Sequence, residues 1–172
     1  LHDTMIYQKS SCKAYDPANM RYKQVFEYMF VLSKGKPKTF NPLKGVPCKK
    51  QHVIGLTSRK IDGTMRKHPQ KIENNAIQDR FNVWVYDTGF MQSTSDFVAF
   101  DHPAIFPDAL AQDHILSWSN SGDLVLDPFT GSGTTCKAAK ELGRNFLGFE
   151  INPEYCKIAE RRIAQEVLDF AS

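Results

Sequence analysis

The C-terminal third of the chain alternates between strand-like and helix-like segments in an order that constrains the fold more than any other feature. Asp123–Asp127 is a short apolar stretch typical of a buried strand, and it runs into a glycine-rich turn. Helical composition follows over 135–142, and a second strand is predicted at 146–150. Asn152 offers an N-cap for a last helix that is predicted to reach about Leu168. This order forms a βαβ unit with parallel strands, so the predicted fold class is α/β.

Length and composition narrow the class of protein. The 172 residues and 41% hydrophobic content suit one ordinary domain with a real core. No apolar run approaches the roughly 20 residues that span a bilayer, and the first ten residues lack the apolar core of a secretion signal. We therefore expect a cytoplasmic protein without a membrane partner. Neither the cysteines nor the histidines have zinc-ligand spacing, so no metal site is predicted.

The rest of the chain is predicted to add strands and one helix. Asp3–Lys9 and Val25–Leu32 have strand-like composition and are joined by a polar loop. Ser33–Gln78 is rich in Lys, Pro, Gly and Asn and is predicted to be loop or irregular extension. An apolar and aromatic patch follows at Phe81–Tyr86. A short amphipathic helix is predicted at Asp108–Trp118, because its apolar residues recur at four- and three-residue spacing.

Charge is distributed very unevenly along the chain. Residues 1–75 carry 15 Lys and Arg against 5 Asp and Glu, a net charge of +10, whereas residues 76–172 carry 7 against 14, a net charge of −7. A segment this basic favours a polyanionic partner, because neutralised phosphates supply much of non-specific nucleic-acid affinity. A solvated basic face is the alternative, and charge by itself does not separate the two.

The glycine-rich turn, Asp127–Thr135, lies where open α/β sheets bind ligands, after a strand and at a helix start. Gly131 and Gly133 allow tight backbone geometry and close approach of a ligand. A nucleotide triphosphate is disfavoured, because a P-loop would place its Lys directly after the second glycine and here Lys137 comes four residues later. A dinucleotide fingerprint is weakened by Cys136, which stands where a small residue is needed.

Glu150 follows Gly131 by 19 residues and ends the second predicted strand. An acidic side chain there can accept hydrogen bonds from both hydroxyls of an adenosine ribose. This spacing fits any adenosine-containing cofactor. The alternative is a turn that needs glycine for backbone reasons alone.

Three motifs together resemble the DNA amino-methyltransferases. The sequence D-P-F-T-G-S-G-T-T at Asp127–Thr135 is similar to the family's cofactor motif, and H-P-A-I-F-P at His102–Pro107 is similar to an element that holds the methionine end of S-adenosylmethionine. Gly143–Tyr155 resembles the family's second strand and following helix. The resemblance implies a Rossmann-like S-adenosylmethionine-dependent methyltransferase fold with an irregular target-recognition insertion. The order of segments resembles the circularly permuted subgroup called beta.

The resemblance also implies site residues. Those expected to bind S-adenosylmethionine are His102, Pro103, Ala104, Phe106, Asp127, Phe129, Gly131, Ser132, Gly133, Thr134 and Glu150. In this arrangement Asp127 positions the methionine ammonium, Glu150 binds the ribose, and His102–Phe106 closes the methionine side. The implied reaction is direct methyl transfer to an exocyclic amino group of a flipped base, with adenine N6 favoured over cytosine N4.

The same resemblance divides the chain into three regions. Residues 1–40 are expected to form the strand pair that ends the catalytic half, 41–97 the target-recognition region, and 98–172 the S-adenosylmethionine-binding region. Double-stranded DNA is the expected partner, and a homodimer is compatible with the resemblance. The residues expected to contact DNA are Lys36, Lys38, Lys44, Lys49, Lys50, Arg59, Lys60, Arg66 and Lys67.

The family's reactive motif, [DNS]-P-P-[YFW], does not occur among the 172 residues, which contain no Pro-Pro dipeptide. In the permuted order this motif belongs upstream of Leu1, together with the central strands of the sheet. We therefore expect exposed sheet edges and no activity from these residues alone. Three alternatives stay open: an inactive DNA-binding remnant, a methyltransferase acting on RNA or protein glutamine, and an NAD-linked oxidoreductase, which Cys136 and the His102–Pro107 element disfavour.

Overall fold

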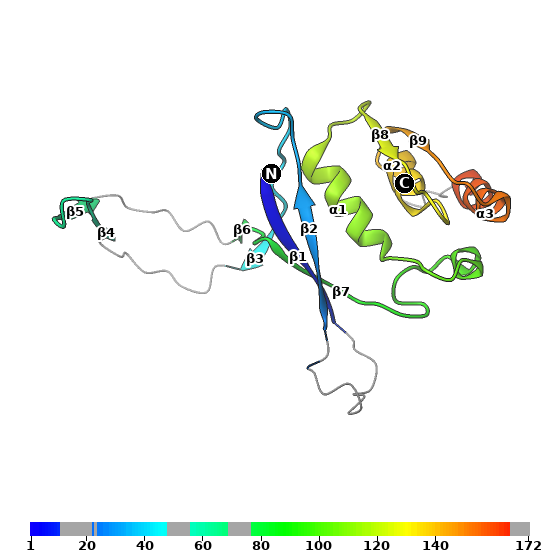
Figure 1. The fold of residues 1–172 in the computed structure, drawn as a ribbon, viewed down its shortest axis with the longest axis horizontal. Coiled ribbons are helices and arrows are strands. Elements are labelled where there is room, and N and C mark those ends of the chain that lie inside the picture. Colours follow the sequence, from blue (N-terminus) through cyan, green and yellow to red (C-terminus); the bar gives the residue numbers. More distant parts are fainter. Residues whose placement is uncertain (11–21, 23, 48–55, 69–76, 166–172) are drawn as a thin grey trace, which may run out of the picture. The chain divides into compact units, whose positions relative to one another are not determined.

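A computed structural model describes the chain except for residues 11–21, 23, 48–55, 69–76 and 166–172 (Figure 1). The chain divides into two units, and each is described separately. The first unit combines Leu1–Leu43 with Phe81–Ser172, and the second is Lys44–Arg80.

A three-stranded sheet organises the N-terminal part of the first unit. Strand β1 (Asp3–Lys9) pairs antiparallel with β2 (Phe26–Val31) and parallel with β7 (Val83–Tyr86), so the strand order is β2-β1-β7. The strands predicted at Asp3–Lys9 and Val25–Leu32 are confirmed. Alternate side chains point to one face, where a buried cluster forms from Met5, Tyr7, Trp84 and Tyr86.

The predicted βαβ unit is present at the other end of the first unit. Strand β8 (Leu124–Asp127) pairs in parallel with β9 (Asn145–Gly148), and helix α2 (Thr134–Glu141) connects them. Helix α3 (Pro153–Ala164) follows, and the side chain of its N-cap Asn152 accepts a hydrogen bond from the Glu154 N–H. The N-cap prediction is therefore confirmed.

The last helix is shorter than predicted. Gln165 has extended backbone angles and ends α3 at Ala164, whereas the sequence predicted helix to about Leu168. The Gln165 amide group lies 3.4 Å from Asp96 Oδ1, so this side chain turns towards the protein instead of continuing the helical face. Residues 166–168 lie outside the described part of the chain.

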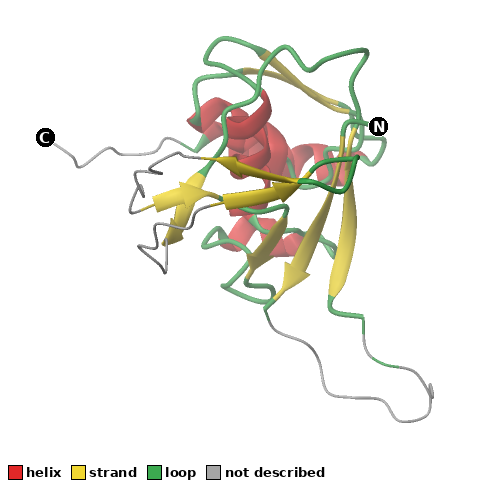
Figure 2. Ribbon diagram, turned by 90° about the vertical axis from the view of Figure 1, so that its left-hand side faces the viewer, coloured by secondary structure: helices red, strands yellow, loops and turns green. Residues whose placement is uncertain are grey.

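Helix α1 (Asp108–Trp118) lies between the three-stranded sheet and the βαβ unit (Figure 1), with the helices gathered close together (Figure 2). Leu110 packs against the sheet cluster, and the His114 ring lies 4.8 Å from the Trp84 ring. Ala111 and Ile115 pack instead against α2. Two adjacent faces of one helix thus join the two halves of the unit. None of the described helices is both long and apolar enough to cross a membrane.

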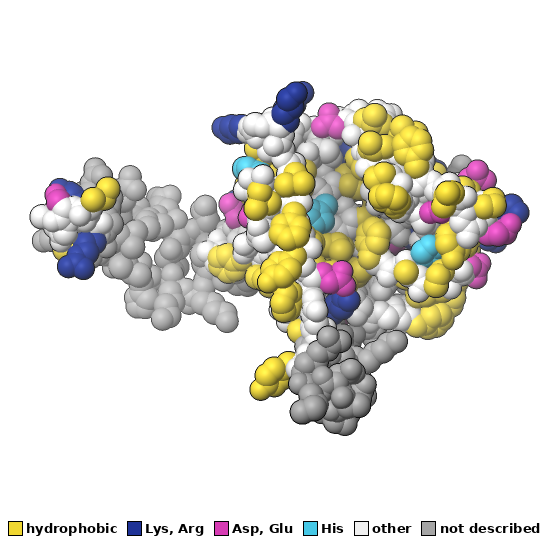
Figure 3. Space-filling model, in the orientation of Figure 1, with side chains coloured by type: hydrophobic (Ala, Val, Ile, Leu, Met, Phe, Trp, Pro, Cys, Tyr) yellow, Lys and Arg dark blue, Asp and Glu magenta, His cyan; other side chains and the backbone are white. Residues whose placement is uncertain are grey.

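Both sheet pieces expose apolar side chains. Among the described residues, β2-β1-β7 and β8-β9 form separate sheets. Tyr28 and Phe30 on β2 are exposed, as are Leu124 and Leu126 on β8, and hydrophobic side chains gather over β2 in Figure 3. The expectation of uncovered sheet pieces is confirmed.

The second unit contains short strand pairs where the sequence predicted irregular structure. Strand β3 (Lys44–Pro47) pairs with β6 (Ile77–Asp79), and β4 (Leu56–Arg59) pairs with β5 (Met65–His68) in an antiparallel hairpin. Strand β7 (Val83–Tyr86) lies outside this unit and belongs to the sheet of the first unit. The low apolar content of these short strands explains why the sequence did not reveal them.

Close packing of α2 against α3 generates the first prediction. A Cβ atom at Gly133 would lie 2.8 Å from Ala159 Cβ and 3.0 Å from Ala159 Cα, at a φ of +82°. Gly122 has a φ of +83° with no neighbour within 4 Å of a Cβ position, so it is a matched control. Gly122→Ala should destabilise by about 1–2 kcal/mol through its backbone angle. Gly133→Ala should lose a further 1–3 kcal/mol, roughly, through overpacking.

Chemical denaturation of the two variants measures this difference. If Gly133→Ala and Gly122→Ala lose the same unfolding free energy, then α2 and α3 can move apart to admit the extra methyl group without an energetic cost.

Candidate functional site

The glycine-rich turn is fixed at the carboxyl ends of both parallel strands. The Thr130 N–H donates to Phe149 O at 2.9 Å, and the Phe149 N–H donates to Asp127 O at 2.9 Å. Asp127 Oδ1 accepts from the Phe129 N–H at 3.0 Å, which shapes the start of the turn. Gly133 adopts the left-handed conformation and begins α2. The turn, the start of α2 and the end of β9 therefore meet at one edge of the sheet.

Glu150 lies directly against this turn. One carboxylate oxygen accepts from the Gly131 N–H at 3.0 Å and the other accepts from the Asn152 N–H at 2.8 Å. The hydrogen bond from Asn152, followed by that from Gly131, lowers the pKa of the Glu150 carboxyl below its ordinary value. Each carboxylate oxygen has about two acceptor positions. An ionised, fixed Glu150 can thus still accept hydrogen bonds from two neighbouring hydroxyl groups of a ligand.

His102 faces the turn from the opposite side. A Cβ atom at Gly131 would lie 3.2 Å from His102 Nε2, and the φ of Gly131 is +51°, so only glycine fits without strain. The His102 ring also meets the Tyr155 ring of α3 edge to face, with 4.2 Å between the centroids. The predicted residues His102, Gly131 and Glu150 are therefore brought together.

A cavity of about 850 Å³ adjoins the His102–Phe106 segment. Its size is within the range of small-molecule sites. Pro103, Ala104 and Phe106, which the sequence predicted to bind a cofactor, are among the residues that line it. Further lining side chains, which the sequence did not single out, are Tyr7, Lys9, Glu27, Phe90 and Phe100.

Other predicted cofactor residues face elsewhere. Ser132 and Thr134 are buried, and their hydroxyl oxygens accept hydrogen bonds from Arg162 Nη1 at 2.9 and 2.8 Å. The missing Cβ of Gly133 makes room for Ala159 of α3. Phe129 is 87% exposed. Residues 132–134 of the turn thus pack against α3, whereas Phe129 is open to solvent.

Arg162 is fully buried and forms the centre of a charged network. Its Nε lies 2.8 Å from Asp96 Oδ2 and its Nη2 lies 3.2 Å from Asp108 Oδ1, while Lys137 Nζ lies 3.3 Å from Asp96 Oδ2. Burial raises the pKa of Asp96, but the hydrogen bond from Arg162 and the charge of Lys137 outweigh it, so the pKa is lowered overall. Sequence reasoning missed this network. The available signal was an arginine on the same helical face as the buried Ile158 and Ala159.

The predicted DNA-contacting residues are only partly described. Lys36, Lys38, Lys44, Arg59 and Lys60 are exposed. Lys44 forms an ion pair with Asp79 across β3 and β6. Arg66 and Lys67 belong to β5, but their side chains lie outside the described part, as do Lys49 and Lys50 altogether.

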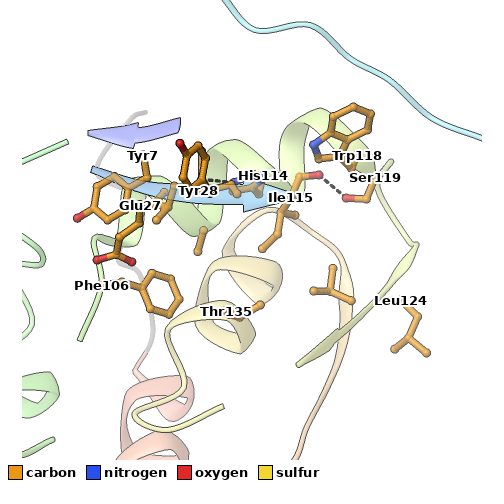
Figure 4. A pocket seen from close by; sticks show the side chains of 14 residues that line it. Tyr7, Glu27, Tyr28, Phe106, His114, Ile115, Trp118, Ser119, Leu124 and Thr135 are labelled. Atoms are coloured by element: carbon orange, nitrogen blue, oxygen red, sulfur yellow. Dashed lines mark hydrogen bonds between the residues drawn. The ribbon is translucent and has the colours of Figure 1, made fainter. Parts of the chain in front are cut away.

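A second cavity, of about 630 Å³, separates the two sheet pieces (Figure 4). Tyr28 of β2, Leu124 of β8, and Ile115 and Trp118 of α1 line it, so it follows the α1 face between the unpaired strands. Trp118 Nε1 is buried and is the only such side-chain atom without a hydrogen-bond partner among the described residues. Buried donors without a partner are rare in native proteins.

A family model described as DNA methylase matches residues 1–161. The chain belongs to this DNA methylase family. It is 49% identical over 172 residues to the orphan methyltransferase M.BamHII of Bacillus amyloliquefaciens, a match that covers 98% of this chain and 64% of that protein. The DNA adenine methyltransferase YhdJ of Escherichia coli (strain K12) is 52% identical over 63 residues, which are 37% of this chain and 21% of that protein.

The fold of this chain is also similar to that of a solved structure. The crystal structure of the M1.HpyAVI-SAM complex superposes with a TM-score of 0.54 at 27% identity, covering 95% of this chain and 62% of that one. The predicted methyltransferase fold and the resemblance to DNA amino-methyltransferases are therefore confirmed. The chain spans less than two thirds of the length of these relatives.

Proposed function

We propose that this chain is the S-adenosylmethionine-binding part of a DNA methyltransferase that modifies an exocyclic amino group, with adenine N6 favoured over cytosine N4. The observation that carries the proposal is the Glu150 carboxylate, held against the Gly131 turn by two backbone N–H groups with acceptor positions remaining. Vicinal ribose hydroxyls fit this acceptor pair. The adenine preference is supported by the likeness to a protein described as a DNA adenine methyltransferase.

The proposed site assigns a task to each group of residues. Glu150 binds the ribose, Asp127 lies near the methionine ammonium, and His102–Phe106 forms the wall on the methionine side. The bound cofactor supplies an activated methyl group, and the protein contributes alignment. The crystal structure of a similar protein as a SAM complex supports the choice of cofactor.

Duplex DNA is the proposed partner of the second unit. At the tip of the β4-β5 hairpin, the Gly63 N–H donates to Lys60 O, and Asp62 Oδ1 accepts from the Thr64 N–H and hydroxyl, which together fix the turn. Arg59 and Lys60 are exposed beside this turn, and Ile61 projects fully into solvent. A two-stranded ribbon with exposed cations has the dimensions of the major groove. The cytoplasm is the proposed location, and a homodimer stays a prediction.

A second candidate is a DNA-binding protein that has lost catalysis, which the absence of [DNS]-P-P-[YFW] from these 172 residues favours. The apolar cavity along α1 supports a different explanation for this absence. Its apolar lining between β2 and β8, each of which pairs on one side only among the described residues, fits further strands of the same sheet. Finding the motif in the gene upstream of Leu1 would decide in favour of the enzyme.

Glu150 provides a direct test of cofactor binding. Glu150→Ala in the whole protein should weaken S-adenosylmethionine binding by about 30- to 1,000-fold, because two hydrogen bonds from the ribose to a carboxylate are lost. Glu154→Ala is the control, since Glu154 is an exposed acid in the next turn that pairs with Lys157. Calorimetry showing equal affinities for the two variants would remove Glu150 from the site.

The 172 residues alone should transfer no methyl group to DNA. They lack the reactive motif, and their two sheet pieces are uncovered. The measurement is incorporation of labelled methyl groups into DNA by the purified chain, with the whole protein as the positive control. Incorporation by the short chain would place the reactive residues within 1–172.

Salt dependence tests the DNA surface. Log affinity should fall with log salt at about −0.9 per phosphate neutralised, so Arg59→Ala with Lys60→Ala should flatten the slope by up to about 2. Affinity for all DNA sequences should fall alike, because phosphate contacts position the protein without specifying a sequence. Lys157→Ala with Arg161→Ala removes two exposed charges from α3 and is the control. Equal slopes for the two double variants, measured by fluorescence anisotropy, would show that the hairpin is a solvated face.

A further inference from the structure

We propose that Arg162 is a positioning residue that fixes the two walls of the S-adenosylmethionine site relative to each other. This inference rests on the proposed function, because it takes the Gly131 turn and the His102–Phe106 segment as those walls. Arg162 lies on α3 beneath the turn and is fully buried, so it acts through other residues and does not touch the ligand.

One side of the guanidinium holds the glycine-rich turn. Nη1 lies 2.9 Å from Ser132 O, 2.9 Å from Ser132 Oγ and 2.8 Å from Thr134 Oγ1. The backbone carbonyl of Ser132 sits between the two glycines whose positive φ angles give the turn its shape. These contacts hold the residues directly after Gly131, whose N–H binds Glu150.

The other side of the guanidinium holds both ends of the segment that carries His102–Phe106. Asp96 precedes the short helix η2 (Phe97–Asp101) and caps it through the Val98 N–H, and its Oδ2 lies 2.8 Å from Arg162 Nε. Asp108 is the first residue of α1, and its Oδ1 lies 3.2 Å from Nη2. Arg162 thus binds both Asp96 and Asp108, and the segment between these two residues carries His102, which lies beside Gly131.

The geometry requires arginine specifically. The planar guanidinium presents N–H groups in three directions: Nε faces Asp96, Nη2 faces Asp108, and the two N–H groups of Nη1 are shared among Ser132 O, Ser132 Oγ and Thr134 Oγ1, whereas a lysine ammonium has three donors around a point charge. Arg162→Lys therefore keeps the positive charge between Asp96 and Asp108 but cannot hold both walls. A purely structural arginine would lose stability on this change without a selective effect on the ligand.

The test compares Arg162→Lys with Arg144→Lys in the whole protein. Arg144 is the control for replacing an arginine by lysine away from the turn, because its guanidinium, which is half-buried, also donates to a hydroxyl and to backbone carbonyls, those of Ser119 and Leu142. We expect Arg162→Lys to weaken S-adenosylmethionine binding by about 10- to 100-fold in calorimetry, from the loss of charge-assisted hydrogen bonds. Arg144→Lys should leave this affinity unchanged.

Amide hydrogen exchange without ligand is the second readout. In Arg162→Lys, exchange should accelerate at residues 131–134 and 102–106 and stay unchanged in β1 and β7. If Arg162→Lys fails to fold, Thr134→Val is the second variant, because it removes one acceptor from Arg162 with little change in shape. It should weaken cofactor binding and accelerate amide exchange in the same segments, but by less. In a methylation assay of the whole enzyme, KM for the cofactor should rise more than kcat falls.

The outcomes separate this inference from the proposed function. If the wild type binds S-adenosylmethionine and Glu150→Ala weakens binding, but Arg162→Lys behaves like Arg144→Lys in both readouts, the positioning role is overturned and the site stands. If the wild type does not bind the cofactor, the proposed function falls. Local acceleration of exchange would even then show that Arg162 holds the two segments together.

Discussion

The structure of the first unit depends on Arg162, a fully buried cation whose charge must be balanced by carboxylates and hydrogen-bond acceptors. A fully buried guanidinium carries a large desolvation cost, which is offset only when carboxylates and hydrogen-bond acceptors surround it. Asp96, Asp108, Ser132 and Thr134 meet this requirement, and they come from three segments: the start of η2, the start of α1 and the glycine-rich turn. Because Arg162 needs all of them at once, the chain cannot move any of these segments independently. The glycine-rich turn and the helix that follows it are therefore shaped from the interior as much as from the ligand side.

Glycine contributes to this arrangement in two distinct ways. At Gly131 the absence of a Cβ leaves room for the His102 ring, whereas at Gly133 it leaves room for Ala159 of α3. Both residues also adopt left-handed backbone angles. The turn therefore packs against His102 at Gly131 and against α3 at Gly133. Glu150 adds a third contact by accepting a hydrogen bond from the Gly131 N–H. Such a turn is largely formed before any ligand arrives.

Local patterns in the sequence were enough to predict most elements of the first unit. The strands at β1 and β2, the bounds of α1, and the βαβ unit all follow from short-range periodicity and capping, as the Asn152 N-cap illustrates. The roles of Ser132 and Thr134 could not be predicted in this way, because they depend on Arg162, about 30 residues further along the chain. The early end of α3 has a similar cause, since the Gln165 side chain turns towards Asp96. The short strands of the second unit lack the apolar alternation that makes a strand visible in sequence.

Helix α1 gives the first unit a mechanical property. Its Leu110 and His114 lie against the three-stranded sheet, and its Ala111 and Ile115 lie against α2, so the same three turns contact both halves. A helix is stiff along its axis, and close packing allows little independent sliding of either partner. Its first residue, Asp108, is also bound to Arg162. If the three-stranded sheet shifted, α1 would move with it as a stiff body. Through Asp108 and Arg162, that movement would reach the glycine-rich turn without passing through a loop.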